Sequence, residues 1–388
     1  MIRLILLTDF TEAFAHYLLK GILAYSQGRI LWVVCRMPPS YKHTHGIRGV
    51  LEWAHKWEAD AIIGQFDTTD EVELFANSGI VALAQDYKKR WECIPNITGA
   101  YHLTGKMAAT YFLQKGFRHF AFYGYKDVVW SQERCDGFRA EIGRHGYAEN
   151  FYEYQHQQLD NLWFYEAGPL CEWLRSLPHP VALMACDDNQ ASRITEACTL
   201  CGLHIPEDIA VLGVDNDELT CTLSDPTLSS VDMNIERGGY EAAELIEQLL
   251  HTPGLPYQDV VIQPTGIVSR QSTNTYSTTD PYILKALQYI HQHIDRPFVV
   301  NDIVEQVPLS RRLLETRFRK ETRKSVYQYI LHLRIERFTQ LLLRSDDPIA
   351  EIALQTGFQD VRNMARPFRA VKGCTPLEYR RKHQYRKS

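Results

Sequence analysis

The sequence has no run of about 18 apolar residues, which excludes a transmembrane helix. Its N-terminal apolar stretch, MIRLILLTDF, is too short and too soon followed by an acidic residue for a signal peptide. The GxSxG, HExxH and P-loop patterns of common enzyme sites are also missing. Ordinary contents of hydrophobic (45%) and charged (23%) residues exclude a disordered chain, a coiled coil and a collagen-like repeat. These absences predict a cytoplasmic globular protein without a membrane partner, and 388 residues suffice for two or more domains.

Cysteine is present without a pattern that would bind metal. The nine cysteines are an odd number, scattered along the chain, as is typical of a reducing compartment. Cys198 and Cys201 form a CxxC pair, but no second pair of ligands accompanies them. We therefore predict no metal site and no cofactor.

Charge is distributed unevenly along the chain. Residues 281–388 carry 21 Lys and Arg against 11 Asp and Glu, whereas residues 1–280 carry 21 basic and 36 acidic groups. One end is thus strongly basic and the remainder strongly acidic. This asymmetry favours a nucleic-acid-binding end joined to a domain of another kind, although charge alone also allows a merely solvated basic surface.

Three regions differ in their periodicity. Residues 1–270 alternate short apolar runs with amphipathic stretches, which predicts two α/β lobes with parallel sheets. Residues 271–280 are rich in Ser and Thr and indicate a linker. Residues 281–388 have a helical pattern throughout, and Asp280 and Pro281 suit the start of their first helix. The strand candidates are Leu4–Leu7, Ile30–Val34, Ala61–Gly64, Val81–Leu83, His119–Tyr123, Ala182–Ala185, Ala210–Val214 and Val260–Ile262.

Two segments of the basic region share one plan: a short helix, a tight turn, a capping residue and a basic helix. Ser310 supplies the cap in the first segment and Asp360 in the second. Leu313, Leu314 and Phe318 would hold one face of the first basic helix inward. A basic helix of this size fits the major groove of DNA, where Arg can bind guanine edges. The plan predicts two helix-turn-helix units.

The spacing of the same region resembles the AraC/XylS family of transcription regulators. The matching positions are Arg334, Leu341-Leu342, Ile349-Ala-Glu-Ile-Ala353, Gly357-Phe358, Phe368-Arg369, Gly373-Cys-Thr-Pro376 and Tyr379-Arg380. The resemblance implies two helix-turn-helix units that enter successive major-groove segments on one face of double-stranded DNA. It implies these DNA-binding residues: Arg311, Arg312, Glu315, Thr316, Arg319, Val361, Arg362, Arg366 and Arg369. Among them, Arg319 and Arg369 are expected to contact phosphate or to serve the structure. Pro367 departs from a regular helix and is expected to kink the second recognition helix.

In the first region, acidic residues follow the strand candidates. They are Asp9, Asp67, Asp86, Asp187-Asp188 and Asp215. Ligands of parallel α/β sheets bind outside the carboxyl ends of the strands, and carboxylates accept hydrogen bonds from several hydroxyls. Aromatic residues such as Trp130 could cover the apolar face of a sugar. A carbohydrate site is the reading we favour, although each Asp could instead cap a helix, Asp188 above all.

This region resembles the effector domain of the LacI/GalR family. The matching segments are 131–138, 182–191, 202–215 and 226–243. The resemblance implies a two-lobed fold like that of periplasmic binding proteins, hinged around a sugar. It implies these ligand-binding residues: Asp9, Asp67, Asp86, Trp130, Arg134, Asp188 and Asp215, with Arg134 and Asp215 foremost. A LacI-like sensor followed by AraC-type helices resembles regulators of sugar operons, and this resemblance implies D-xylose as the ligand.

The sequence therefore predicts a sugar-responsive transcription activator rather than an enzyme. Its expected partners are double-stranded DNA, a sugar, a second copy of the chain and RNA polymerase. Two alternatives stay open at this point. Clefts lined by carboxylates also occur in enzymes that act on sugars, and the first region could be only a dimerisation module of a ligand-independent DNA-binding protein.

Overall fold

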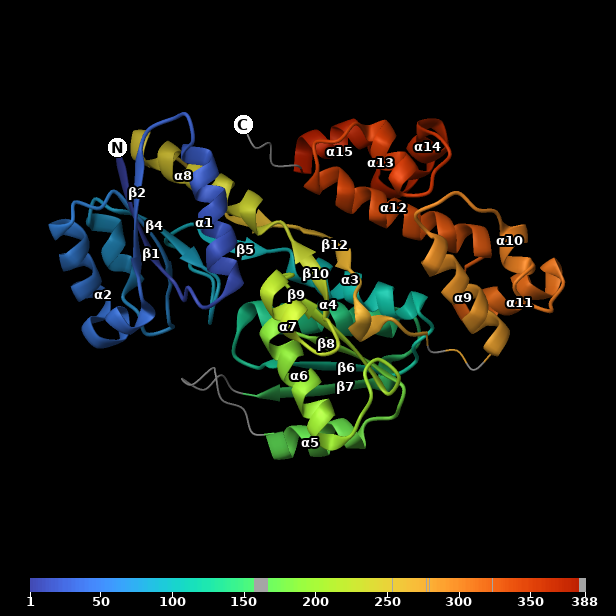
Figure 1. The fold of residues 1–388 in the computed structure, drawn as a ribbon. Coiled ribbons are helices and arrows are strands. Elements are labelled where there is room, and N and C mark those ends of the chain that lie inside the picture. The colour runs from blue at the N-terminus through green and yellow to red at the C-terminus, as the bar shows by residue number, and fades with distance from the viewer. Residues whose placement is uncertain (157–166, 253, 277, 279, 323, 384–388) are drawn as a thin grey trace.

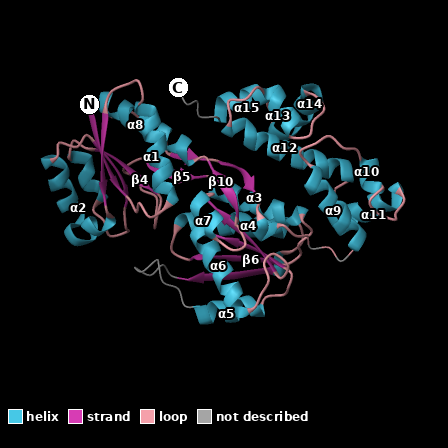
Figure 2. Cartoon of the chain, viewed as in Figure 1, coloured by secondary structure: helices cyan, strands magenta, loops and turns pink. Residues whose placement is uncertain are grey.

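The computed structural model describes residues 1–156, 167–252, 254–276, 278, 280–322 and 324–383 (Figure 1). Two α/β lobes, each built on a six-stranded sheet, are followed by a helical domain, and this confirms the predicted fold class. Strands lie only in the two lobes of the described chain, whereas the last third is helical (Figure 2).

The sheet of the first lobe is parallel throughout. In spatial order its strands are β11 (Val260–Ile262), β5 (Asn96–Gly99), β4 (Val81–Gln85), β3 (Ala61–Gln65), β1 (Ile2–Leu7) and β2 (Trp32–Met37). The helices of this lobe are α1 (Ala13–Ser26), α2 (Pro39–Lys56), α8 (Ile235–His251) and the 3-10 turn η1 (Val72–Asn77). Helices α1 and α8 cross closely at two glycines, because a Cβ on Gly21 would lie 1.9 Å from the Glu236 carbonyl oxygen and one on Gly239 2.1 Å from that of Leu18.

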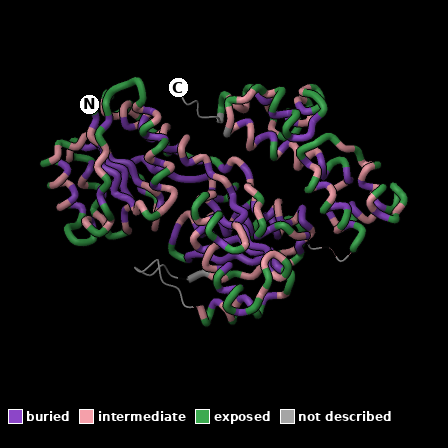
Figure 3. The backbone as a smooth tube through the Cα atoms, viewed as in Figure 1, coloured by how far each residue is buried: buried purple, intermediate pink, exposed green. Residues whose placement is uncertain are grey.

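The sheet of the second lobe is parallel except for its β10–β12 pair. In spatial order its strands are β12 (Pro264–Val268), β10 (Ser229–Met233), β9 (Ile209–Val214), β8 (Val181–Ala185), β6 (Phe120–Tyr125) and β7 (Phe151–His156). Its helices are α3 (Tyr101–Gln114), α4 (Val129–Arg144), α5 (Ala167–Ser176), α6 (Asp188–Cys201), α7 (Glu218–Leu223) and the 3-10 turn η2 (Ala148–Asn150). Figure 3 shows that the inner strands of both sheets are largely buried, as in parallel sheets covered on both faces, whereas edge strands such as β2 and β11 are partly exposed.

The chain crosses between the lobes in three places: after β5, after β10 and between β11 and β12. Backbone hydrogen bonds join these crossings, from Ala100 N to Ile262 O (2.8 Å) and from Asn234 N to Gln263 O (3.0 Å). The lobes also meet away from the crossings, where Val129 N donates to Tyr87 O (2.8 Å). The two lobes are therefore held about a shared three-stranded connection.

The helical domain has two cores joined by one long helix. Its helices are α9 (Pro281–His293), α10 (Val300–Val304), α11 (Arg311–Thr322), α12 (Val326–Arg344), α13 (Ile349–Gln355), α14 (Val361–Lys372) and α15 (Pro376–His383). Helix α12 contributes Tyr329 and Ile330 to the first core and Phe338 and Leu342 to the second. Asp280 caps α9 by accepting from Tyr282 N and Ile283 N, as predicted. None of the described helices is both long and apolar enough to cross a membrane.

Part of the segment expected to be a linker lies against the second lobe. In the 3-10 turn η3 (Gln271–Thr273), Ser272 Oγ donates to Val211 O (2.6 Å) and Thr273 Oγ1 bonds Ser229 Oγ (2.7 Å). Tyr276 is buried in the first helical core. The hydroxyls of Ser272 and Thr273 thus attach this segment to the sheet of the second lobe. Residues 277 and 279 lie outside the described residues.

Helix α12 and the end of α3 form the junction between the second lobe and the helical domain. Gln340 Nε2 on α12 donates to the Ile267 carbonyl of β12, and Gln114 at the end of α3 lies 2.8 Å from His332 Nε2. Next to Gln114, the Lys115 ammonium lies over the ring of Tyr276 at 4.5 Å. Burial at this junction lowers the pKa of Lys115 to about 7. The helical domain is therefore in direct polar contact with the second lobe.

Candidate functional site

Polar side chains of the two lobes meet around Arg134 of α4, and we call this region between the lobes the cleft. The side chain is buried, with 3% of the residue exposed. Its Nη2 donates to Asp215 Oδ1 (2.9 Å) and its Nη1 to Cys186 O (2.5 Å). Burial lowers the pKa of Arg134, but Asp215 together with Tyr101, Cys186 and Asp187 raises it by more, so the guanidinium stays charged. Its Nε has no hydrogen-bond partner among the described residues and is a donor that a ligand can use.

Two aromatic rings lie beside this guanidinium. Its Cζ is 5.2 Å from the ring centroid of Tyr101 and 5.3 Å from that of Trp130. Tyr101 begins α3 directly after the first crossing between the lobes. On the opposite side, Asp215 and Asn216 adopt φ angles of 94° and 52°, a left-handed conformation that is costly for residues other than glycine. Strain of this kind is common where a loop is held in place for a ligand.

Asp86 supplies an acceptor from the first lobe. It follows β4, and its Oδ2 accepts from Thr98 Oγ1 (2.5 Å) and Arg90 Nε (3.1 Å). Its Oδ1 is buried without a partner among the described residues. Burial raises the pKa of Asp86 to about 6. Arg90 also forms a two-bond ion pair with Glu133 of α4 (2.7 and 2.8 Å), which ties this acceptor to the other lobe.

Glu12 belongs to the cleft, and the sequence analysis missed it. Asn189 Nδ2 of α6 donates to Glu12 Oε2 across the lobes (3.2 Å). Burial, followed by the nearby carboxylates of Asp187, Asp9 and Asp215, raises the pKa of Glu12 to about 8. Asp9, which the sequence predicts as a ligand-binding residue, accepts from Thr11 N (2.8 Å) and Thr11 Oγ1 (2.7 Å) and closes a turn. The only signal for Glu12 in the sequence is its place just before α1.

Asp188 does not cap α6, so the capping alternative to its predicted ligand-binding role is wrong. The preceding residue, Asp187, is the cap, and its Oδ1 accepts from Gln190 N (2.7 Å). Asp188 is buried and its Oδ2 accepts from Asp217 N (2.7 Å). It thereby holds the loop that carries Asp215. The reason is that α6 begins at Asp188 itself, so that the preceding residue, Asp187, has the extended backbone of a cap.

Asp67 is engaged elsewhere in the first lobe. Lys42 Nζ of α2, which is buried, lies 3.0 Å from Asp67 Oδ2 and 2.6 Å from Asp70 Oδ2. The structure thus brings Arg134, Asp215, Trp130 and Asp86 together with Glu12, while Asp67 is neutralised by a lysine of its own lobe.

The raised pKa of Glu12 makes the stability of the ligand-free chain depend on pH. The folded-state value of about 8 exceeds the ordinary 4.5, so the folded state retains a proton that the unfolded state releases. The free energy of unfolding therefore falls as the pH rises from about 4.5 to about 8. We expect Glu12→Gln to raise the melting temperature at pH 8 and to have little effect at pH 4.5, as measured by calorimetry. Glu207→Gln, at an exposed position, is the control, and an E12Q curve that follows the parent chain at both pH values would contradict the assignment.

The first helix-turn-helix unit consists of α10 and α11. Ser310 Oγ accepts from Leu313 N (3.3 Å) at the start of α11. Leu314 and Phe318 are buried in the core, whereas Leu313, expected to face inward, is 41% exposed. The exposed residues of α11 include Arg311, Arg312, Thr316 and Arg319. Glu315 Oε2 accepts from Val326 N (3.2 Å), so this side chain supports the start of α12 rather than facing outward.

The second unit consists of α13 and α14. Asp360 caps α14 by accepting from Asn363 N (2.8 Å), as predicted. Met364 and Phe368 are buried in the second core, against which Val361 packs in part. The helix continues through Pro367 to Lys372. The expected kink therefore does not end the helix, whose first turn and buried face hold it in place. Its exposed arginines are Arg362, Arg366 and Arg369.

Both units present arginines without hydrogen bonds on their recognition helices. Within the described part of the chain, the guanidinium groups of Arg312, Arg362 and Arg366 form neither a hydrogen bond nor an ion pair. Arg311 Nη1 donates to Asn301 Oδ1 (3.3 Å), and Thr316 Oγ1 donates to Arg312 O (2.9 Å). Each unit thus offers guanidinium groups that an external acceptor can bind.

Comparison with known proteins assigns both parts of the chain. Residues 109–273 match the family described as periplasmic binding protein-like domain, and residues 303–382 match a helix-turn-helix domain family. The xylose operon regulatory protein of Haemophilus influenzae is 30% identical over 386 residues, which cover 97% of this chain and 98% of that protein. The protein of the same name from Escherichia coli K12 is 26% identical over 398 residues, covering 97% and 96%.

A solved structure resembles the whole chain. The structure of the xylose-binding transcription activator xylR covers 99% of this chain and 98% of its own, with a TM-score of 0.59 and 26% sequence identity. The likeness therefore extends over both lobes and the helical domain in the same order.

Proposed function

This chain belongs to the family of xylose operon regulatory proteins and is a transcription regulator, and we propose that it is an activator controlled by D-xylose. In this proposal residues 1–270 bind the sugar between the lobes, and residues 281–388 bind promoter DNA through both helix-turn-helix units. The active form is a homodimer that acts on RNA polymerase.

One observation carries the sugar-binding part: the buried Arg134–Asp215 ion pair has an unused donor and lies beside aromatic rings. A pentose hydroxyl can accept from Arg134 Nε, and another can donate to Asp86 Oδ1. Tyr101 and Trp130 can cover its apolar C–H groups. Binding of a polar ligand would give both buried atoms a partner, which removes the cost of leaving them unpaired.

We propose binding without catalysis. The relatives over the full length are transcription regulators. The two central carboxylates are each held by an arginine, Asp215 by Arg134 and Asp86 by Arg90. Such pairs suit the recognition of hydroxyls and hold the charge of the cleft fixed.

DNA binding is supported by the exposed arginines of α11 and α14. An Arg on a helix in the major groove can bind the O6 and N7 atoms of guanine together. The excess of basic residues in residues 281–388 adds attraction to phosphates. Because one module reads a short site, we propose that two copies bind paired half-sites, which multiplies specificity.

The sugar would control DNA binding through the second lobe. Helix α3 begins at Tyr101 in the cleft and ends at Gln114, which contacts His332 of α12. A ligand shifts an equilibrium only as far as its affinities for the two states differ. We propose that D-xylose favours the closed lobes and that α3 conveys the change to α12.

Calorimetry and DNA selection test this proposal with the full chain. Titration with D-xylose, L-arabinose and D-glucose should show one site that prefers D-xylose. Selection from random duplexes with D-xylose present should enrich one sequence, whose affinity should fall about 5- to 150-fold when the sugar is withdrawn. No heat with D-xylose would overturn sugar sensing, and equal DNA affinity with and without sugar would overturn control by the sugar.

A further inference from the structure

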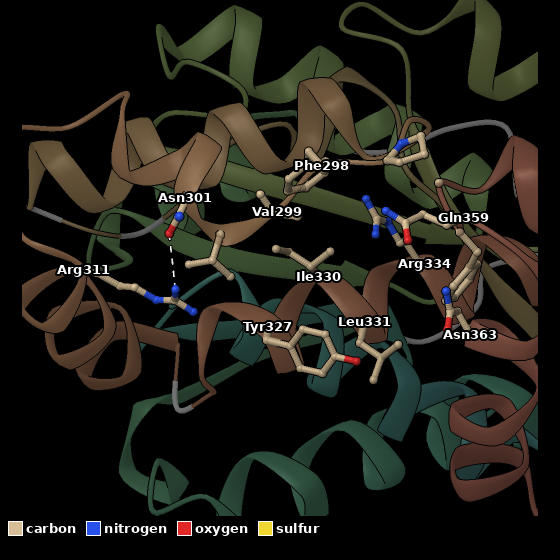
Figure 4. A pocket seen from close by; sticks show the side chains of 14 residues that line it. Phe298, Val299, Asn301, Arg311, Tyr327, Ile330, Leu331, Arg334, Gln359 and Asn363 are labelled. Carbon is tan, nitrogen blue, oxygen red and sulfur yellow. Dashed lines mark hydrogen bonds between the residues drawn. The ribbon is translucent and has the colours of Figure 1, made fainter.

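A cleft of about 510 Å³ lies between the two helix-turn-helix units, over helix α12. Its first rim carries Asn301 and Arg311 of the first unit, and its second rim carries Gln359 and Asn363 of the second. Tyr327 and Arg334 of α12 form part of its floor. Figure 4 shows Asn301 and Arg311 at one end, Gln359 and Asn363 at the other, and Tyr327 between them. We call this feature the inter-unit cleft.

Most of the residues that line the inter-unit cleft are apolar, and its polar and positively charged side chains are those of Asn301, Arg311, Arg334, Gln359 and Asn363. Its lining includes Arg311 and Arg334 and no acidic residue. Arg334 Nη2 donates to Arg296 O (2.9 Å) and its guanidinium lies 4.8 Å from the Phe298 ring centroid, while its Nε is buried without a partner among the described residues. A cleft with this charge is complementary to an anion.

The rims stand at the ends of the helices that face DNA. Arg311 is the first residue of α11 and Asn363 the third of α14, and both are exposed. Asn301 lies at the start of α10, the first helix of its unit. In a helix-turn-helix, the beginning of the recognition helix meets the duplex and the first helix crosses the backbone. The mouth of the cleft therefore opens toward the side on which a duplex would lie.

The geometry of the duplex decides which part of the DNA lies between the two recognition helices. Two recognition helices in successive major-groove segments on one face leave a minor groove between them, flanked by one backbone of each strand. The surface between α11 and α14 must face that minor groove, and the inter-unit cleft occupies this surface.

We propose that the inter-unit cleft receives the phosphate backbones on either side of this minor groove. Arg311 and Asn301 bind a phosphate of one strand, and Gln359 and Asn363 bind a phosphate of the other. Arg311 thus sets the register of the protein on DNA and reads no base. The inference rests on the proposed function, because it requires that both units bind one duplex.

The first test separates a phosphate contact from base reading. It uses the full chain with D-xylose and a duplex that the chain has selected from a random pool. Arg311→Ala should weaken binding of the selected and a scrambled duplex by the same factor, about tenfold, which corresponds to one lost charge-assisted hydrogen bond. It should also lower the slope of log K against log salt concentration by about 1. Arg311→Lys, which keeps the charge, should restore the slope.

The second test locates the phosphates on the DNA. Neutral methylphosphonate linkages replace single phosphates of each strand between the two major-groove segments. The parent chain should lose about tenfold in affinity at one or two linkages of each strand. Arg311→Ala should be insensitive to those of one strand and Asn363→Ala to those of the other.

The outcomes distinguish this inference from the proposed function. If the parent chain tolerates neutral linkages at every spacer position, or if Arg311→Ala changes the preference at a single base pair, the inference is wrong and DNA binding stands. If the chain selects no duplex at all, the proposed function fails and the inference fails with it.

Discussion

Replacing Arg134 by methionine is expected to lower the affinity for D-xylose by about 100-fold or more. Arg134 contributes the unused Nε donor of the cleft, and its other nitrogens hold Asp215 and the Cys186 carbonyl in place. A hydrogen bond to a charged group is worth about 1.5–3 kcal/mol, and methionine also leaves the Asp215 carboxylate without its partner. Calorimetric titration of the full chain measures the loss.

Three further variants make this result interpretable. Arg139→Met alters an exposed arginine of the same helix α4 and should leave the affinity unchanged. Arg134→Lys keeps a charge but not the forked geometry, so it should recover only part of the affinity. Because an unpaired Asp215 carboxylate destabilises the fold, Arg134→Met combined with Asp215→Asn removes both charges and should restore stability without restoring binding. Binding of D-xylose by the double variant at the parent affinity would refute the site.

The second large effect is expected on DNA. Replacing both Arg312 and Arg362 by alanine should lower the affinity for the selected duplex by about 100-fold or more, since one Arg that binds a guanine with two bonds discriminates by about 1–3 kcal/mol. The two residues lie on recognition helices of separate cores, so their effects should add. The guanidinium group of neither residue forms a hydrogen bond or ion pair with another described residue, and the loss should therefore not reflect unfolding.

The measurement is fluorescence anisotropy with the selected duplex at 0.15 M salt. Lys285→Ala, an exposed change on α9 outside both recognition helices, is the matched control. Each single variant should lose specificity at a different base-pair position. Parent affinity in the double variant would show that the two helices do not read DNA through these arginines.

Local features of the fold could be predicted because they depend on neighbours a few residues apart. Asp280 and Asp360 cap their helices as the sequence indicates, since a cap bonds the backbone two or three residues further on. The eight strand candidates correspond to strands of the two sheets, whereas β5, β7, β10 and β12 were missed. Strand β10 contains Ser229, Ser230 and Asp232, so its pairing with β9 and β12 and not its own composition makes it a strand.

The cleft was predictable only in part. Arg134 and Asp215 were found because they lie in segments that resemble a known family, yet they are 81 residues apart and nothing in the sequence indicates that they form an ion pair. Asp67 and Asp86 both follow a strand, so the sequence does not distinguish them. In the fold, Lys42 forms an ion pair with Asp67, whereas Asp86 has no such contact with Lys42. Glu315 was predicted to contact DNA, but its carboxylate accepts a hydrogen bond from Val326 N at the start of α12.

By itself, the amino-acid sequence settled where the basic helical end begins, which residues cap α9 and α14 and which kinds of residue follow the strands, because these properties arise within a few residues of chain. The tertiary structure decided which of those side chains meet. Glu12 and Asn189 are 177 residues apart and become neighbours only when the two lobes close on each other. Desolvation and charge in that shared cleft then set the pKa of Glu12, which no local pattern could have revealed.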